Sequence, residues 1–120
     1  MSTPADKWYT RPIFSVSNIA AALTHYCEQL GFKQSWKYEE DGETIVTQVN
    51  KGDMELILTS NLDRVGAGRL FVSLEEPEML DLQALVDQGQ VQAEQIFWGY
   101  PSLRVRDPDG NEMIFPLESE

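Results

Sequence analysis

The sequence contains one cysteine, Cys27, and one histidine, His25. A single cysteine cannot form a disulfide within the chain, and a single histidine cannot supply a His-rich metal site. The N-terminal residues also lack the apolar core of a signal peptide. We therefore expect a cytoplasmic protein in a reducing environment.

Basic residues and long apolar runs are scarce as well. The chain has 9 Lys and Arg against 20 Asp and Glu, which gives a formal net charge of −11. A nucleic-acid backbone or an anionic membrane surface would repel such a chain. No apolar run approaches the roughly 20 residues that a membrane span needs. We therefore expect neither nucleic acid nor a membrane as a partner.

What the sequence does contain is enough apolar material for one compact domain, because 42% of its 120 residues are hydrophobic. In the first half, a strand at residues 11–16 precedes a helix that begins at Ser17 or Asn18 and ends at Gly31. The apolar residues of this helix recur every three or four positions. Turn-forming residues then separate three antiparallel strands, at residues 32–38, 44–49 and 54–59.

The same order of elements recurs in the second half. A strand at residues 69–74 opens with Arg69, as the first strand opens with Arg11, and a helix follows that begins near Pro77 and ends at Gly89. The last three predicted strands lie at residues 92–97, 102–106 and 112–117. We therefore predict an α+β fold of two βαβββ modules in a single domain, residues 1–120. Module one covers about residues 11–60 and module two about 68–118, with a flexible linker at 65–68.

Three motifs at compatible spacing connect this pattern to a known family. They are Pro12-Ile13-Phe14-x-Val16-x-Asn18-Ile19, Tyr26-x-x-x-Leu30-Gly31-Phe32 and Arg106-Asp107-Pro108-Asp109-Gly110-Asn111. Together they resemble the vicinal oxygen chelate superfamily, which includes glyoxalase I, extradiol dioxygenases and bleomycin resistance proteins. The resemblance implies two βαβββ modules whose curved mixed sheets enclose a cleft. It also implies a homodimer with sites near the interface.

Enzymes that the chain resembles typically hold a divalent metal with His and Glu ligands on the first and last strands of each module. Carried over residue by residue, the first-strand positions are Arg11 and Arg69, and the last-strand positions are Leu56 and Ile114. None of these side chains is a usual metal ligand. The resemblance therefore leads us to expect no metal and no other cofactor, although Glu112, on the same strand face as Ile114, keeps a displaced metal site open.

Without the metal positions, the chain resembles the bleomycin resistance branch, whose members use the cleft for binding without chemistry. Trp98-Gly99, followed by a strand that ends in Arg106-Asp107-Pro108, supports this comparison. Aromatic side chains suit a planar ligand, and an acidic exterior attracts a cationic antibiotic-like one. The same aromatics could instead form the core. The candidate aromatic ligand contacts are Trp36, Tyr38, Phe97, Trp98 and Tyr100.

Three charged residues complete the candidate site. Arg11 and Arg69 would favour a carboxylate or phosphate on the ligand, unless they pair with carboxylates such as Glu112 or lie in water. Two enzymatic alternatives stay open. One is a glyoxalase-type lyase or dioxygenase with displaced metal ligands. The other is a metal-free enzyme with Glu112 as general base beside an arginine.

Nucleophilic catalysis by Cys27 is not expected. His25 lies off the apolar stripe of the first helix and is predicted to be solvated, whereas Cys27 lies on that stripe and is predicted to belong to the core. Two positions apart on a helix, the side chains point to different faces. The base that a cysteine nucleophile needs is therefore missing.

Overall fold

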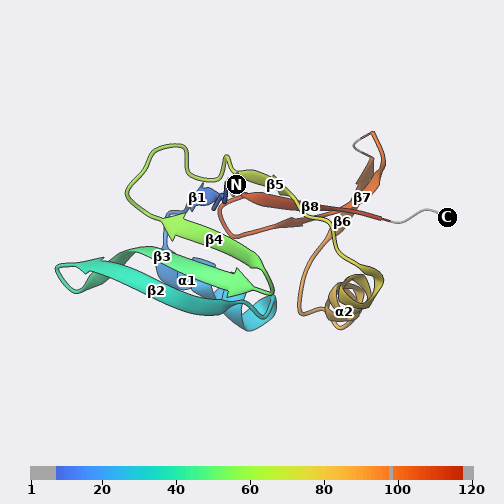
Figure 1. Ribbon diagram of the computed structural model, residues 1–120, viewed down its shortest axis with the longest axis horizontal. Helices are drawn as coiled ribbons and strands as arrows, with labels where there is room; N and C mark the ends of the chain where they lie inside the picture. The colour runs from blue at the N-terminus through green and yellow to red at the C-terminus, as the bar shows by residue number, and fades with distance from the viewer. Residues whose placement is uncertain (1–7, 98, 118–120) are drawn as a thin grey trace, which may run out of the picture.

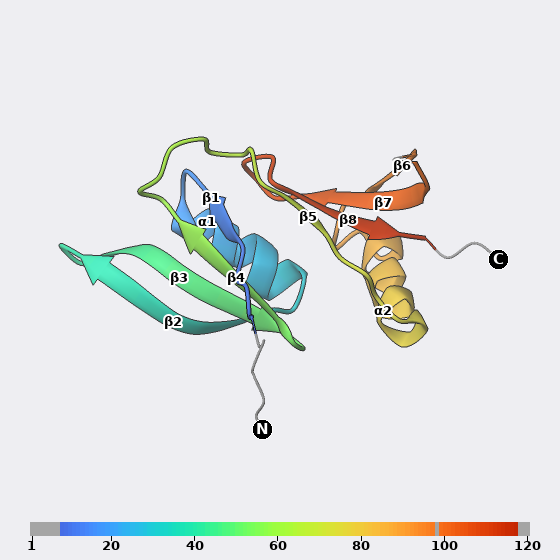
Figure 2. The same ribbon diagram turned by 45° about the horizontal axis from the view of Figure 1, so that its top comes forward.

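The computed structural model of the protein describes residues 8–97 and 99–117. It contains two four-stranded sheets that lie side by side, each with its helix on one face (Figures 1 and 2). The first half of the chain forms β1 (Ile13–Ser15), α1 (Ile19–Leu23), the π-helix η1 (Thr24–Gln29), β2 (Lys33–Glu40), β3 (Glu43–Lys51) and β4 (Met54–Thr59). The second half forms β5 (Arg69–Phe71), α2 (Glu76–Asp87), β6 (Glu94–Phe97), β7 (Pro101–Arg106) and β8 (Glu112–Pro116).

Both sheets have the same topology. Their strand orders are β1-β4-β3-β2 and β5-β8-β7-β6. In each, the first strand pairs in parallel with the last, and the other neighbours are antiparallel. The predicted α+β fold with two βαβββ repeats is confirmed, and we call the halves module one and module two. No helix in the described ranges is long and apolar enough to cross a membrane.

The first helix differs from its prediction in its second half. Asn18 caps it, with the side chain accepting a hydrogen bond from the Ala21 N–H at 2.9 Å, but after Leu23 the chain continues as a π-helix. A π-helix has i→i+5 hydrogen bonds, so its side chains are rotated relative to the 3.6-residue period on which the prediction relied. The prediction of a solvated His25 is therefore wrong: the side chain is buried and packs edge-on against Tyr26. Cys27 packs partly buried against the core, as expected.

The segment predicted as a flexible linker is packed against both modules. The Gly66 N–H donates to the Ser15 carbonyl at 3.2 Å, and the Gly68 N–H donates to Asn111 Oδ1 at 2.7 Å. A Cβ on Gly68 would lie 2.4 Å from the Phe14 ring, closer than real contacts allow. The glycines thus serve close approach of the backbone rather than flexibility, which corrects the prediction.

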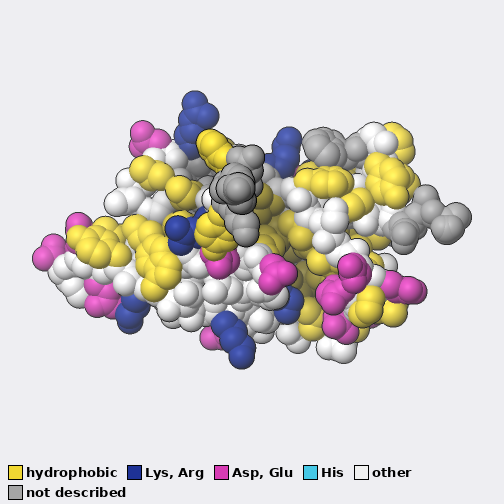
Figure 3. Space-filling model, viewed as in Figure 1, with side chains coloured by type: hydrophobic (Ala, Val, Ile, Leu, Met, Phe, Trp, Pro, Cys, Tyr) yellow, Lys and Arg dark blue, Asp and Glu magenta, His cyan; other side chains and the backbone are white. Residues whose placement is uncertain are grey.

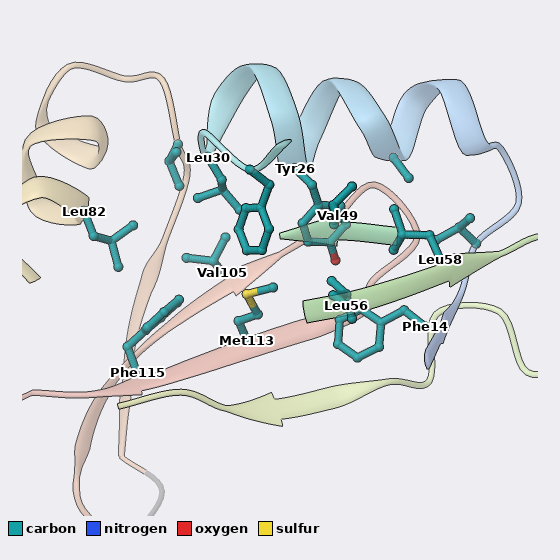
Figure 4. Close-up of a cluster of buried hydrophobic side chains, with 14 of the residues drawn as sticks. Phe14, Tyr26, Leu30, Val49, Leu56, Leu58, Leu82, Val105, Met113 and Phe115 are labelled. Carbon is teal, nitrogen blue, oxygen red and sulfur yellow. The ribbon is translucent and has the colours of Figure 1, made fainter. Parts of the chain in front are cut away.

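The core is continuous across the two modules. Figure 4 shows Tyr26 and Leu56 of module one pointing into the same cluster as Val105, Met113 and Phe115 of module two. Side chains alternate along β4 and β8, so every second residue of each strand faces away from this cluster. We call the surface away from the core the open face of each sheet.

The turn between β7 and β8 fastens the modules together. Asp107 Oδ2 accepts hydrogen bonds from the Tyr26 hydroxyl and from Asn111 Nδ2, each at 2.9 Å. Its Oδ1 accepts from the backbone N–H groups of Asp109 and Asn111. Asn111 Nδ2 also donates to the Ser15 carbonyl at 3.0 Å. Asp107 and Asn111 of the third sequence motif therefore form a buried structural clamp in this fold.

Candidate functional site

A row of charged side chains crosses the open face of module two. Arg69 of β5, Glu112 of β8 and Arg106 of β7 are register partners across three adjacent strands. Arg69 Nε lies 3.1 Å from Glu112 Oε1, and Arg106 Nε lies 3.4 Å from Glu112 Oε2. Arg104 Nη1 approaches the same Oε2 at 3.5 Å. Glu112 is thus the centre of a cluster with three arginines.

Glu94 adds a second carboxylate, in the neighbouring cross-strand row. It is the register partner of Arg104, whose Nε and Nη2 donate to Glu94 Oε1 at 2.9 and 2.6 Å. These hydrogen bonds, together with the positive charge of Arg104, lower the pKa of Glu94. We call the five residues Arg69, Glu94, Arg104, Arg106 and Glu112 the arginine cluster.

The open face of module one has a smaller polar group at the corresponding place. Arg11 Nη1 donates to Gln48 Oε1 at 3.0 Å, and its Nε lies 4.0 Å from Glu55 Oε1. The Tyr9 hydroxyl donates to Glu55, and the Arg11 guanidinium lies 5.6 Å from the centre of the Tyr9 ring. Trp36 Nε1 donates to the same Gln48 oxygen at 2.9 Å. Arg11 therefore contacts three groups: the Gln48 amide oxygen, the Glu55 carboxylate and the Tyr9 ring.

Strand register corrects the equivalence that counting from the turns predicted between Leu56 and Ile114. Ile13 pairs with Ile57, and Phe71 pairs with Ile114, so Leu56 corresponds to Met113. The count was one position out because the β7–β8 turn is longer than the β3–β4 turn. Leu56 belongs to the core, whereas Ile114 lies on the open face.

The same register places one carboxylate beside each first-strand arginine, Glu55 near Arg11 and Glu112 beside Arg69. Both oxygens of Glu112 face guanidinium donors, and an arginine has no lone pair to offer a cation. Within residues 8–97 and 99–117, no group of three His, Cys, Asp or Glu could hold a metal ion. These residues do not fit the divalent metal that the resemblance associates with enzymes.

Those predicted aromatic contacts that the structure describes do not lie together within one chain. Trp36 and Tyr38 lie on the open face of module one, opposite Gln48 and Val46 of β3. Strand alternation places Phe97 on the helix side of its sheet, with Gln95, and it is 77% exposed. Trp98 lies outside the described residues. Tyr100 lines a groove beside α2.

That groove is a separate feature, on the helix side of module two. It has a volume of about 530 Å³ and lies between α2 and the end of β8. A second groove of about 370 Å³ lies farther along the same helix. Neither includes a member of the arginine cluster, and no predicted site residue except Tyr100 lines either of them.

The one thiol and the one imidazole do not form reactive groups. Burial raises the pKa of Cys27, and the nearby Glu28 raises it further, which disfavours the nucleophilic thiolate. Burial lowers the pKa of His25, partly offset by the charge of Asp107 and a hydrogen bond with Gln29. Burial also raises the pKa of Tyr26, so its hydroxyl stays a donor to Asp107.

Sequence reasoning named Arg69 and Glu112 but missed part of the cluster. Arg104 and Arg106 stand two positions apart on a strand, and this spacing places both side chains on the same face of the sheet. That signal was available in the sequence. Glu94 had none, because its position opposite Arg104 depends on the register of β6.

Comparison with known proteins identifies one family and several solved structures of similar fold. The family model of the Glyoxalase/Bleomycin resistance protein/Dioxygenase superfamily matches residues 9–115. No curated protein matches the chain.

Solved structures that are similar include binding proteins and an enzyme. The bleomycin-binding protein from bleomycin-producing Streptomyces verticillus, complexed with copper(II)-bleomycin, is 16% identical. The match covers 97% of this chain and 100% of that one, with a TM-score of 0.69. TnmS3, an antibiotic binding protein from Streptomyces sp. CB03234, is 20% identical over 96% and 100%, with a TM-score of 0.67. Lactoylglutathione lyase from Agrobacterium tumefaciens is 16% identical over 95% of each chain, with a TM-score of 0.67. At these identities the likeness establishes the fold.

Proposed function

This chain belongs to the glyoxalase/bleomycin resistance protein/dioxygenase superfamily, and from that premise we propose that it is a non-enzymatic binding protein of the bleomycin resistance type. It sequesters a small aromatic, antibiotic-like molecule in a cleft between two copies of the chain. The similar folds of a bleomycin-binding protein and of TnmS3 support this proposal.

The observation that carries the proposal is that arginine side chains surround the carboxylate of Glu112. In a metal-dependent enzyme, a carboxylate at this place would offer its lone pairs to a cation. Here Oε1 accepts a hydrogen bond from Arg69 and Oε2 accepts one from Arg106, and Arg104 Nη1 lies 3.5 Å from Oε2. The described parts of the open faces also present aromatic side chains such as Trp36 and Tyr38, which suit the binding of a planar ligand.

Exposed apolar side chains support the assembly of two copies. Ile13, Trp36 and Tyr38 lie on the open face of module one and Phe71 on that of module two, and each is at least 39% exposed. Figure 3 shows hydrophobic side chains over β2 and β3 and over β6 and β7, while acidic side chains gather over α2. The radius of gyration is 15.7 Å, against about 14 Å for a compact chain of this length. A second copy would cover the apolar parts of these faces.

The metal-free enzyme with Glu112 as general base has less support. A base must present a free lone pair to the proton that it removes. Arginine donors lie against both oxygens of Glu112, Arg69 at Oε1 and Arg106 and Arg104 at Oε2. Glu112 therefore acts in this proposal as the anchor of the arginine side chains.

A ligand panel with metal analysis tests the proposal. Thermal unfolding is measured with bleomycin-type compounds and with planar aromatic antibiotics, before and after dialysis against a chelator. We expect at least one compound to stabilise the fold, by about 2.7 kcal/mol at a hundredfold excess over its Kd, equally in both preparations. Light scattering should give a dimer. Stoichiometric zinc, nickel, iron or manganese, removed by the chelator with loss of an activity, would contradict non-enzymatic binding.

A further inference from the structure

Positive charge exceeds negative charge in the arginine cluster, although the protein as a whole carries a formal charge of −11. Three guanidinium groups, from Arg69, Arg104 and Arg106, stand against the two carboxylates of Glu94 and Glu112. A local positive surplus on so acidic a surface marks a place where an anion is attracted rather than repelled.

Within the described part of the chain, two of the three arginines have no contact at either Nη nitrogen. Arg104 differs from them, because each of its nitrogens has a carboxylate nearby: Nε and Nη2 donate to Glu94, and Nη1 lies 3.5 Å from Glu112 Oε2. Arg69 and Arg106 contact Glu112 only through Nε. Among the described residues, nothing accepts a hydrogen bond from the Nη atoms of these two arginines, whose side chains are 60% and 50% exposed.

The same contacts hold these donors in place. Glu112 is 11% exposed and lies between Arg69 and Arg106 in one cross-strand row, so it tethers both guanidinium groups at Nε and leaves their outer ends toward solvent. A tethered guanidinium loses less conformational entropy when it binds an anion. The two outer nitrogens of an arginine match the paired oxygens of a carboxylate or phosphate.

An exposed aromatic side chain lies on the same face as the two arginines. Phe71 follows Arg69 by two positions on β5, so it shares the open face, and it is 51% exposed. Its register partner Ile114 is 2% exposed, so Phe71 supplies the apolar surface at this place. A ring that carries an acidic group can therefore place its oxygens at the arginines and its carbon atoms against β5.

Module one provides an internal comparison. Its only open-face arginine in the corresponding position, Arg11, contacts Gln48, Glu55 and the Tyr9 ring. One guanidinium faces one carboxylate there, so that face has no positive surplus. The anion-binding features belong to module two alone.

We propose that the outer ends of Arg69 and Arg106, on the open face of module two, form a subsite for an oxyanion, a carboxylate or phosphate group attached to an aromatic ligand. The proposal deepens the binding function proposed above, because it assigns the ligand an acidic group. In the sequence, Arg11 and Arg69 favoured an anionic group on the ligand, whereas the acidic exterior favoured a cationic ligand. The proposal chooses the anionic group.

Matched small probes test the charge preference. Benzoate, phenyl phosphate, benzamide and benzamidine share one ring and differ in charge. Arginine Nε–Hε signals are followed by NMR at constant ionic strength, because salt screens exposed charges. We expect saturable shifts with benzoate or phenyl phosphate, and at least about tenfold weaker binding of benzamide. Whichever anion binds more tightly identifies the acidic group. The proposal would be overturned if benzamidine bound as tightly as the preferred anion. It would also be overturned if neither benzoate nor phenyl phosphate gave a saturable shift.

Matched variants locate the subsite. Arg69→Gln and Arg106→Gln should each weaken binding of the preferred anionic probe by about fivefold or more, and Arg11→Gln by less than about twofold. Equal losses in all three variants would overturn the assignment to module two. If a Gln variant does not fold, Arg69→Lys and Arg106→Lys keep the charge but not the paired donors, and should still lose about threefold.

The two proposals fail in distinguishable ways. Anionic probes that bind as expected, with no antibiotic-like compound stabilising the fold, would leave the oxyanion subsite and remove the antibiotic-binding function. An antibiotic-like ligand whose affinity is unchanged in Arg69→Gln and Arg106→Gln would retain the function and overturn the subsite.

Discussion

The two modules share one strand order, yet they differ in how they use it. Module one buries four residues of its helical segment, Ile19, Ala22, His25 and Tyr26, whereas α2 of module two buries only Leu82. Module two instead holds the buried clamp at Asp107 and the arginine cluster on its open face. A repeated fold can therefore divide its tasks: one repeat supplies much of the core, and the other holds the charged groups.

The largest expected loss of stability comes from the clamp in the β7–β8 turn, which is compared with the β3–β4 turn of module one. Asp107→Ala removes four hydrogen bonds, leaves the buried Tyr26 hydroxyl without its acceptor and takes one of two acceptors from the Asn111 side-chain amide. We expect the free energy of unfolding to fall by about 3 to 4 kcal/mol. Asp53→Ala, in the exposed β3–β4 turn, is the matched control and should cost less than about 0.5 kcal/mol. Similar urea midpoints for the two variants would contradict the difference.

The next effect compares the two open faces. Glu112→Gln leaves three guanidinium groups without their central charge, and we expect a loss of about 1 to 3 kcal/mol of unfolding free energy. Glu55→Gln removes the more exposed carboxylate of module one, whose arginine retains Gln48, and should cost less than about 1 kcal/mol. Chemical denaturation at low and high salt measures both. A larger loss for Glu55→Gln would reverse the comparison.

A smaller effect separates the two helix starts. The Asn18 side chain accepts a hydrogen bond from the Ala21 N–H, whereas Glu75 precedes α2 without a side-chain cap bond. Asn18→Ala should therefore lower the free energy of unfolding by about 1 kcal/mol, and Glu75→Ala should change it by less than about 0.5 kcal/mol. Thermal unfolding of both variants decides whether only the first helix depends on its cap.

The smallest expected effect is the pH dependence that His25 of module one contributes. Burial lowers the pKa of His25 below its ordinary value of 6.5 in the folded state. As the pH falls below 6.5, the unfolded chain binds a proton that the folded chain does not yet bind, so the free energy of unfolding decreases. This contribution to stability is present above 6.5 and lost as the pH falls toward the folded pKa.

Urea unfolding at about pH 7.5 and pH 5.5 measures the effect, with His25→Gln as control. The difference between the two pH values should be larger for the natural chain than for the variant, because carboxylate titration is common to both. An equal difference in the two proteins would mean that His25 titrates alike in the folded and unfolded states.

Much of the fold could be predicted because it rests on interactions between neighbours in the sequence. The strand order, the cap at Asn18 and the turns between antiparallel strands follow from residues a few positions apart. The charges of Arg69 and Glu112 also suggested their ion pair, since few other partners suit an arginine in a cleft.

The sequence alone determined the two βαβββ repeats and the family that they indicate, because hydrophobic period, caps and turns are written locally. Only the tertiary structure decided the rest. It buried His25 through a π-helix, packed the linker glycines against Phe14 and Asp109, and separated the predicted aromatic contacts. It also placed Arg69 beside Glu112, 43 positions away in the chain. Such juxtapositions depend on strand register and on contacts between modules, and a shift of one residue would turn every side chain of a strand to the other face.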